Sequence, residues 1–164
     1  MFSIEELNRY STTVRRKFAE KLASMPAEAV ERDREASFHS MKNIMLHMID
    51  NEDWMVNYVV EGRSGEYKRR SWGEYSGMDM VIGHLNEVEA KTARFMKGVD
   101  AGKLSSTVTF RTSKGNDISM TVEECLFQSF TEQLYHMGEL IALMWQDEIE
   151  PPAMQWFYNS PRSG

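Results

Sequence analysis

The sequence lacks the features that mark several large classes of protein. Cys125 is the only cysteine, which excludes an intramolecular disulfide and is typical of a reducing compartment. No apolar stretch approaches the roughly 20 residues that a membrane span needs, and the amino terminus lacks the basic and apolar regions of a signal peptide. The formal net charge of -6 gives no sign of a basic surface for nucleic acid. We therefore expect a cytoplasmic protein that acts on a small-molecule substrate and binds neither membranes nor nucleic acid.

The length and the position of two prolines predict a single domain. A chain of 164 residues can bury a substantial core without a second domain. Pro151 and Pro152 end the helical pattern, so residues 1–150 are predicted to form the domain. Residues 151–164 contain several aromatic side chains and are predicted to be a tail that packs on the domain or on a partner chain. The many apolar helix positions also favour a homodimer formed through helix faces.

Four stretches repeat apolar residues every three or four positions, which is the pattern of amphipathic helices. They are expected to begin near Ser3, Ser37, Ser76 and Thr121, and the second is expected to reach about Val60, just before Gly62. Residues 27–36 have little periodicity and are predicted to be a connection. Residues 107–120 alternate apolar and polar side chains around a turn at 113–116. The predicted fold is all-α, an up-down four-helix bundle with a short β-hairpin between helices 3 and 4.

The strongest candidate for a functional site lies on the second and fourth predicted helices. Glu132 and His136 are one helical turn apart, so both side chains lie on one face of the fourth helix. His47 lies beside apolar positions of the second helix and is expected to point inward. Two imidazoles and a carboxylate can supply three ligands to one divalent metal ion. Gly138, in the middle of the fourth helix, predicts that another backbone approaches closely there.

Other residues are expected to surround this group because of their helical positions. The predicted pocket or supporting residues are Asn51, Trp54, Tyr58, Tyr135 and Glu139. His84 lies at the edge of the apolar stripe of the third helix and is interpreted as a boundary residue. A second hypothesis stays open at this point, in which both histidines hydrogen-bond to Glu132 without a metal, and the bundle has a binding or structural role.

The order of these elements and two local motifs resemble the DinB/YfiT-like family of metal-binding four-helix bundles. The family pattern Ser…His-x-x-x-x-Glu-x-Trp is matched by Ser40, His47, Glu52 and Trp54. The family's fourth helix has His-x-x-x-His, followed by a basic residue and a glycine. Here Glu132 replaces the first histidine and Met137 the basic residue. The resemblance therefore implies a metal site with two histidines and one carboxylate, formed by His47, Glu132 and His136.

The resemblance also implies a chemistry. Members of the family with known activity are metal-dependent transferases and isomerases that use low-molecular-weight thiols. The prediction for this chain is one divalent ion, zinc or nickel first and iron or manganese next, with a small thiol as cosubstrate and a small electrophile as substrate. Three protein ligands leave a coordination position open, which is typical of a catalytic metal. The resemblance does not identify a catalytic residue.

The sequence is also compatible with functions other than thiol transfer. A metal-dependent hydrolase could use Glu139 or Asp50 as a base, although the sequence has no His-Glu-x-x-His motif. A di-iron carboxylate bundle would need two Glu-x-x-His motifs, and the sequence contains none. A metal-free bundle whose site is vestigial is also compatible. Cys125 is expected to be a small buried residue rather than a nucleophile, because no histidine is near it in the sequence.

Overall fold

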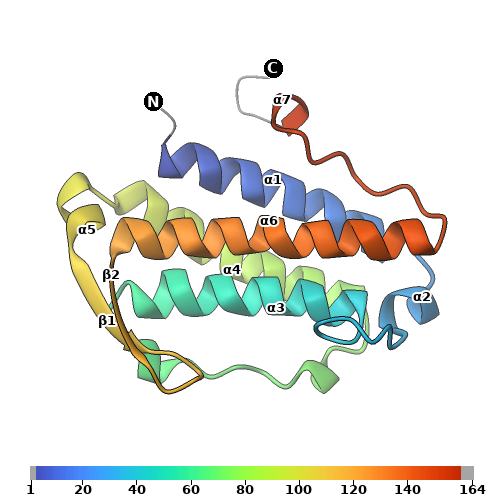
Figure 1. The fold of residues 1–164 in the computed structure, drawn as a ribbon, viewed down its shortest axis with the longest axis horizontal. Helices are drawn as coiled ribbons and strands as arrows, with labels where there is room; N and C mark the ends of the chain where they lie inside the picture. Colours follow the sequence, from blue (N-terminus) through green and yellow to red (C-terminus); the bar gives the residue numbers. More distant parts are fainter. Residues whose placement is uncertain (1–2, 160–164) are drawn as a thin grey trace.

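The fold is a bundle of four long helices, with shorter elements at its ends and along one side (Figure 1). The computed structural model describes residues 3–159. Its helices are α1 (Ile4–Ala23), α2 (Ala27–Glu31), α3 (Met41–Trp54), α4 (Met78–Gly98), α5 (Ala101–Ser105), α6 (Val122–Gln146) and α7 (Trp156–Asn159). Its strands are β1 (Thr107–Arg111) and β2 (Asp117–Thr121), and three short segments are η1 (Met55–Val59), η2 (Ser64–Glu66) and η3 (Trp72–Glu74). The predicted four-helix bundle with a hairpin before the last long helix is therefore confirmed.

Local sequence signals explain where the long helices begin. Ser3 caps α1 and exchanges hydrogen bonds with Glu6, and Thr121 caps α6 in the same way with Glu124. Ser40, rather than the predicted Ser37, caps α3 by accepting a hydrogen bond from the backbone N–H of Asn43. The first three residues of the expected second helix therefore belong to the loop before it. The expected connection 27–36 also contains the short helix α2.

The direction of α4 differs from the strict up-down order that we expected. The connection 60–77 runs back along the bundle, so α3 and α4 point the same way (Figure 1). Lys42, at the start of α3, donates to the carbonyl of Tyr75 just before α4, and Lys91 of α4 pairs with Asp53 near the end of α3. An extended chain covers about 3.3 Å per residue. The connection is therefore long enough to cross the length of α3, which a short turn could not do.

One apolar core fills the space between the four long helices. Its fully buried residues include Val14, Phe18, Ile44, Met45, Leu85, Val88, Leu126, Phe130 and Met137. Gly138 does not take part in this packing, because it is exposed and no atom would lie within 4 Å of a Cβ added there, apart from the backbone of its own helix and its immediate neighbours. The predicted close approach of another backbone at Gly138 is therefore wrong.

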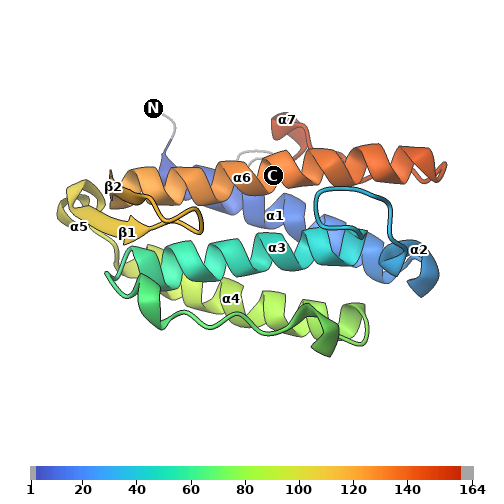
Figure 2. The ribbon, with the colours of Figure 1, turned by 60° about the horizontal axis from the view of Figure 1, so that its bottom comes forward.

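The β-hairpin leans over the side of the bundle where α3 faces α6 (Figure 2). Its strands pair antiparallel, with Phe110 opposite Ile118 and Arg111 opposite Asp117. Phe110 is buried and its ring meets Trp54 edge-on, with 5.5 Å between the ring centroids. This contact holds the hairpin against the end of α3, so the hairpin forms a wall beside the groove between α3 and α6.

The chain after Pro151 and Pro152 returns to α1. The hydroxyl of Tyr10 donates to the carbonyl of Met154, and the rings of Tyr10 and Trp156 lie 4.8 Å apart. Residues 160–164 of the predicted tail lie outside the described residues. Within residues 3–159, no helix combines the length and apolar character that crossing a membrane requires.

Candidate metal centre

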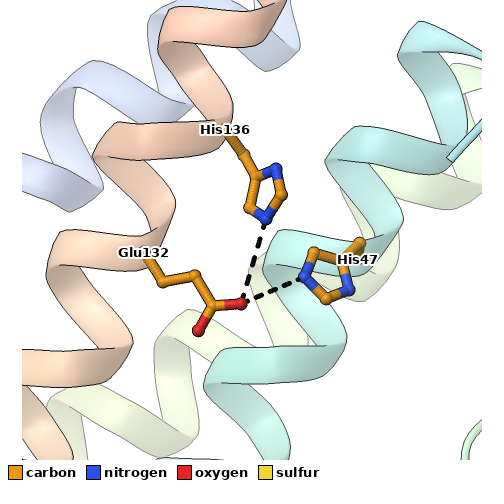
Figure 3. A group of neighbouring side chains, drawn as sticks. All are labelled: His47, Glu132 and His136. Atoms are coloured by element: carbon orange, nitrogen blue, oxygen red, sulfur yellow. Dashed lines mark hydrogen bonds and ion pairs between the residues drawn. The ribbon is translucent and has the colours of Figure 1, made fainter. Parts of the chain in front are cut away.

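His47, Glu132 and His136 meet between α3 and α6 (Figure 3). One carboxylate oxygen of Glu132, Oε1, lies 3.2 Å from Nε2 of His47 and 3.9 Å from Nε2 of His136. One possible ligand atom from each residue lies within 4.8 Å of the other two. The side chains of His47, Glu132 and His136 are 17%, 25% and 8% exposed. The group is therefore held by two rigid helices but remains open to a small molecule.

The electrostatics of this triad favour a charged Glu132. The imidazoles of His136 and His47 lower the pKa of Glu132 far below its usual value, although partial burial acts in the opposite direction. Burial alone would lower the pKa of His136, but its contacts with Glu132 and Glu139 outweigh burial and raise that pKa. Glu132 is therefore ionised at neutral pH, which is the form that binds metal ions.

Glu139 supports the triad from the next turn of α6. Its Oε2 lies 3.2 Å from Nδ1 of His136 and accepts the hydroxyl of Ser37 at 2.8 Å, while its Oε1 accepts the backbone N–H of Ser37 at 3.1 Å. A carboxylate at Nδ1 favours the tautomer with its proton on that nitrogen, which leaves Nε2 of His136 free for a metal. Glu139 thus connects His136 of the triad to the loop that contains Ser37.

Phe38 covers the triad from the loop between α2 and α3, and sequence reasoning missed it. Its ring stacks on His47 with centroids 4.0 Å apart and meets His136 edge-on at 5.4 Å. The neighbouring Ser37 ties this loop to Glu139, and Arg34 ties it to Asp147 at the end of α6. The family motif begins with Ser40, so the residues just before it were a signal that could have directed attention to Phe38.

A cleft with a volume of about 600 Å³ opens beside the triad. His47 and Glu132 form one end of it, and α3, α6, the hairpin and the connection 60–77 form its walls. Asn51 and Trp54, two of the residues expected near the triad, line it. The side-chain oxygen of Asn51 is buried without a hydrogen-bond partner among the described residues, so it can accept a hydrogen bond from a ligand.

Two other predicted pocket residues lie outside this cleft. Tyr58 does not line the cleft, because its ring packs on Tyr67 with a centroid distance of 5.2 Å. Tyr58 lies inside the π-helical turn η1, in which the wider hydrogen bond from Val60 N–H to the carbonyl of Met55 rotates the side chains away from their α-helical positions. Tyr135 is 74% exposed, but its ring meets that of His136 edge-on, with 5.1 Å between the centroids, and it borders a second hollow along α6 together with Glu132 and His136.

Three residues considered for other roles are engaged away from the triad. His84 is buried, and its Nδ1 lies 2.7 Å from the hydroxyl of Tyr75, so it belongs to the packing of α4. Cys125 is buried, and burial raises its pKa to about 11, so its thiol is a poor nucleophile at neutral pH. Asp50 lies in the cleft wall, where it accepts a hydrogen bond of 2.7 Å from the indole N–H of Trp72.

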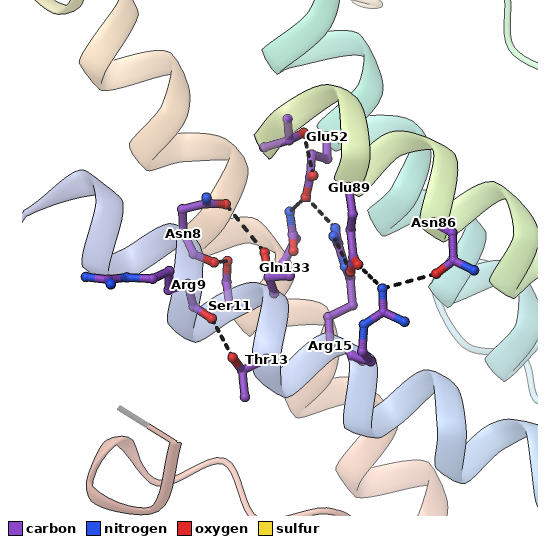
Figure 4. Close-up of polar contacts among 12 residues, drawn as sticks. Asn8, Arg9, Ser11, Thr13, Arg15, Glu52, Asn86, Glu89 and Gln133 are labelled. Carbon is purple, nitrogen blue, oxygen red and sulfur yellow. Dashed lines mark hydrogen bonds and ion pairs between the residues drawn. The ribbon is translucent and has the colours of Figure 1, made fainter. Parts of the chain in front are cut away.

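A buried charge cluster lies on the other side of α3 and α6, and sequence reasoning missed it (Figure 4). Arg15 of α1 forms ion pairs with Glu52 and Glu89. Glu52 also accepts hydrogen bonds of 2.7 Å from Thr92 and from Gln133. Burial raises the pKa of Glu52, but Arg15 and these hydrogen bonds more than compensate and lower it. The glutamate of the second-helix motif therefore has a structural role here.

The donor atoms of the triad suit a divalent transition metal. Zinc, nickel, iron and manganese all accept imidazole nitrogen and carboxylate oxygen as ligands. Two ligands at about 2.1 Å from one ion are at most about 4.2 Å apart. The observed limit of 4.8 Å is slightly wider, so small rotations of the side chains would bring all three into place. The fold and this cluster define a class of four-helix bundles that place potential metal ligands between two helices.

The chain belongs to the DinB family, whose profile matches residues 1–161. Its fold is similar to that of a DinB-like protein from Bacillus subtilis, with a TM-score of 0.67 and 13% identity, covering 93% of this chain and 96% of that chain. A DinB-like protein from Bacillus cereus gives a TM-score of 0.63 and 15% identity, covering 88% and 90%. At these identities the likeness shows the fold alone. No curated protein matches the chain significantly.

Proposed function

We propose that His47, Glu132 and His136 hold one divalent metal ion, and that the protein is a metal-dependent enzyme that transfers a low-molecular-weight thiol to a small electrophile. The observation that carries the proposal is the convergence of three ligand atoms within 4.8 Å, on two helices, beside a cleft. Membership of the DinB family supports it. Zinc or nickel is our first choice for the metal, and iron or manganese the second.

The residues of the chain have separate roles in this proposal. A bound divalent ion would supply the positive charge that keeps a thiol ionised at neutral pH. Glu139 keeps Nε2 of His136 directed to the ion by holding the proton on Nδ1. Phe38 shields His47 from water on one side. Asn51 and Trp54 line the cleft in which the substrate would lie.

Metal analysis of protein purified without a histidine tag tests the first half of the proposal. We expect about one transition-metal ion per chain, and close to none in the Glu132→Ala and His136→Ala variants. The matched controls are Glu123→Ala, at the start of α6, and His39→Ala, whose side chain is 71% exposed and pairs with Asp33. Both controls should keep the metal. Equal metal content in the triad variants and the controls would refute the assignment.

A thiol titration of the cobalt-loaded protein tests the second half. Binding of a thiolate to cobalt produces a strong ultraviolet absorption band, so saturation of this band with increasing thiol measures a dissociation constant. We expect a saturable band that the His136→Ala variant does not show. If the protein binds one cobalt ion per chain but takes up no thiol, the metal site is supported and the proposed thiol transfer is refuted.

A metal-free role is the second candidate, and the contact between His47 and Glu132 favours it. These two side chains already form a hydrogen bond of 3.2 Å, which satisfies part of their polar capacity without an ion. This candidate predicts a melting temperature that does not respond to chelators or added metal. Hydrolysis is less well supported, because Glu139 and Asp50, the two possible bases, are held by Ser37 and Trp72.

A further inference from the structure

The cleft beside the triad combines apolar walls with charged side chains of both signs, which are two arginines and the carboxylates of Asp50 and Glu132. Trp54, Phe110, Ile118 and Met120 supply apolar surface from α3 and the hairpin. Arg69, from the connection 60–77, and Arg111, from the end of β1, also line it. A small molecule with an apolar body and a negatively charged group would match both kinds of surface.

Of these two arginines, Arg69 has more unused hydrogen-bond donors for a ligand. Its Nε lies 3.5 Å from Asp50, and its guanidinium stacks over the ring of Trp72 at 5.4 Å. Asp50 is itself buried and accepts the indole N–H of Trp72. One edge of the guanidinium is therefore anchored on a rigid base. Its two terminal nitrogens have no hydrogen-bond partner among residues 3–159, and a guanidinium edge of this kind binds carboxylate, sulfonate or phosphate groups.

Arg111 is more strongly committed to another partner. Its Nε and Nη2 lie 3.0 and 3.3 Å from the two carboxylate oxygens of Asp117, the residue opposite it in the hairpin. This pairing neutralises most of its charge but keeps it at the rim of the cleft. Arg111 therefore adds little net charge to the cleft, whereas Arg69 offers direct hydrogen bonds.

We propose that the cleft recognises a small molecule through an anionic group bound by Arg69, with its apolar body against Trp54 and the hairpin. Asp50 and Trp72 act as positioning residues that hold Arg69 in place. This inference rests on the proposed function only in that the same cleft serves both; the anion site itself needs no metal. It assigns the substrate or cosubstrate of this cleft to the class of apolar organic anions.

A pair of fluorescent probes tests the inference in metal-free protein. Anilinonaphthalene sulfonate and phenylnaphthylamine share an aromatic body, but only the first carries an anion. We expect the Arg69→Ala variant to bind the sulfonate about five- to tenfold more weakly, the loss expected for one partly exposed charge-assisted hydrogen-bonding group. Binding of the neutral probe should not change. An equal loss for both probes, or no loss for either, would overturn the anion site.

The matched control is Arg70→Ala. Arg70 is adjacent in sequence and its side chain is 56% exposed, against 57% for Arg69, but it pairs with Glu87 and does not line the cleft. This control removes the same charge from nearly the same place, so it measures the long-range electrostatic effect alone. Sulfonate binding to Arg70→Ala should stay within about twofold of the unsubstituted protein. A loss as large as that of Arg69→Ala would overturn direct contact with Arg69.

A second comparison separates this inference from the proposed function. Cobalt-loaded protein is titrated with mercaptopropionate and with its neutral amide, which have the same length. We expect the carboxylate to bind about fivefold more tightly in the unsubstituted protein and in Arg70→Ala, and the two thiols to bind equally in Arg69→Ala. If both thiols bind equally to every variant, the anion site is refuted while the proposed function stands. If neither thiol binds, the proposed function fails and the fluorescent probes alone decide the inference.

Discussion

Two polar clusters on α3 and α6 have similar chemistry but opposite surroundings. In the triad, Glu132 lies against His47 and His136 and is 25% exposed. In the buried charge cluster, Glu52 lies against Arg15, and their side chains are 1% and 0% exposed. Both clusters place a carboxylate next to nitrogen groups from other turns or helices. They differ in how much hydrogen-bonding capacity is left for a ligand.

The carboxylate of Glu52 has almost no hydrogen-bonding capacity left. Both oxygens of Glu52 accept hydrogen bonds, from Arg15 and Gln133 on one side and from Thr92 on the other. In the triad, two imidazole nitrogens converge on the same oxygen of Glu132, next to an open cleft. A buried carboxylate with both oxygens paired stabilises one arrangement of helices, whereas a partly exposed carboxylate beside converging ligand atoms can bind an ion or a small molecule. The exposure of the carboxylate and the bonding of its oxygens therefore distinguish the two clusters better than residue type.

The largest effect should come from breaking the buried cluster. Arg15→Met should lower the free energy of unfolding by about 3 to 5 kcal/mol, because Glu52 would remain buried without its charged partner. Chemical denaturation followed by circular dichroism measures this value. Replacing both partners, as in Arg15→Met with Glu52→Leu, should recover much of the loss, because no unpaired charge would remain.

The control for this prediction is Arg16→Met. Arg16 pairs with Glu89 from the next position of α1, but its side chain is 41% exposed. Its loss should cost less than about 1 kcal/mol, as is usual for exposed ion pairs. If Arg15→Met were no more harmful than Arg16→Met, the buried cluster would not be the structural element that we describe.

The triad should respond in the opposite way. Glu132→Ala should change the stability of metal-free protein by less than about 1 kcal/mol, because the site is partly open to water. It should abolish the stabilisation by metal, which for the unsubstituted protein reaches about 2.7 kcal/mol at a free metal concentration of 100 times the dissociation constant. Thermal unfolding with chelator and with added zinc measures both quantities. A variant that still responds to zinc would show that Glu132 is not a ligand.

The sequence predicts those parts of the molecule that depend on local patterns. The helices, the hairpin, the cap at Ser3 and the capping box at Thr121 follow from periodicity and from caps within one turn. The meeting of His47 with Glu132 follows from helical faces together with the family resemblance. Periodicity does not fix the direction of α4, because a long connection allows either direction.

The residues that prediction missed depend on contacts between distant segments. The position of Tyr58 was predicted wrongly because Tyr58 lies in a π-helical turn that follows α3. No residue type indicates such a turn in the sequence. Phe38 lies in a loop, whose side chains have no periodic face. Arg15 looks like a surface residue by composition, and only its partners Glu52 and Glu89 explain its burial.

A smaller effect on metal binding is expected from Glu139, which contacts His136 but is not itself a proposed ligand. Glu139→Gln should weaken metal binding about tenfold to a hundredfold, because an amide fixes the tautomer of His136 less firmly than a carboxylate. Competition with a chromogenic chelator measures the dissociation constant. Glu123→Gln removes the same charge from the exposed first turn of α6 and should change the constant by less than about twofold. Equal effects would mean that Glu139 acts only through its charge.

The smallest effect is a dependence on pH whose sign reverses with metal. In metal-free protein the pKa of His136 is raised above its unfolded value of 6.5. Its contribution to stability is therefore complete below pH 6.5 and is lost as the pH rises through the folded pKa. The pKa of His84 is lowered by burial, so its own contribution changes only below pH 6.5. Above pH 6.5 the melting temperature of metal-free protein should therefore fall, and His136 is the cause.

Metal-loaded protein should show the opposite trend over the same pH range. Protons compete with the ion for His136, so raising the pH strengthens metal binding and with it the stability of the folded state. Melting curves between pH 6.5 and 8.5, with chelator and with zinc, should therefore diverge as the pH rises. His136→Asn should remove both trends. If the melting temperatures of metal-free and zinc-loaded protein changed in parallel with pH, His136 would not be a ligand of the metal. It would then be a structural partner of Glu132.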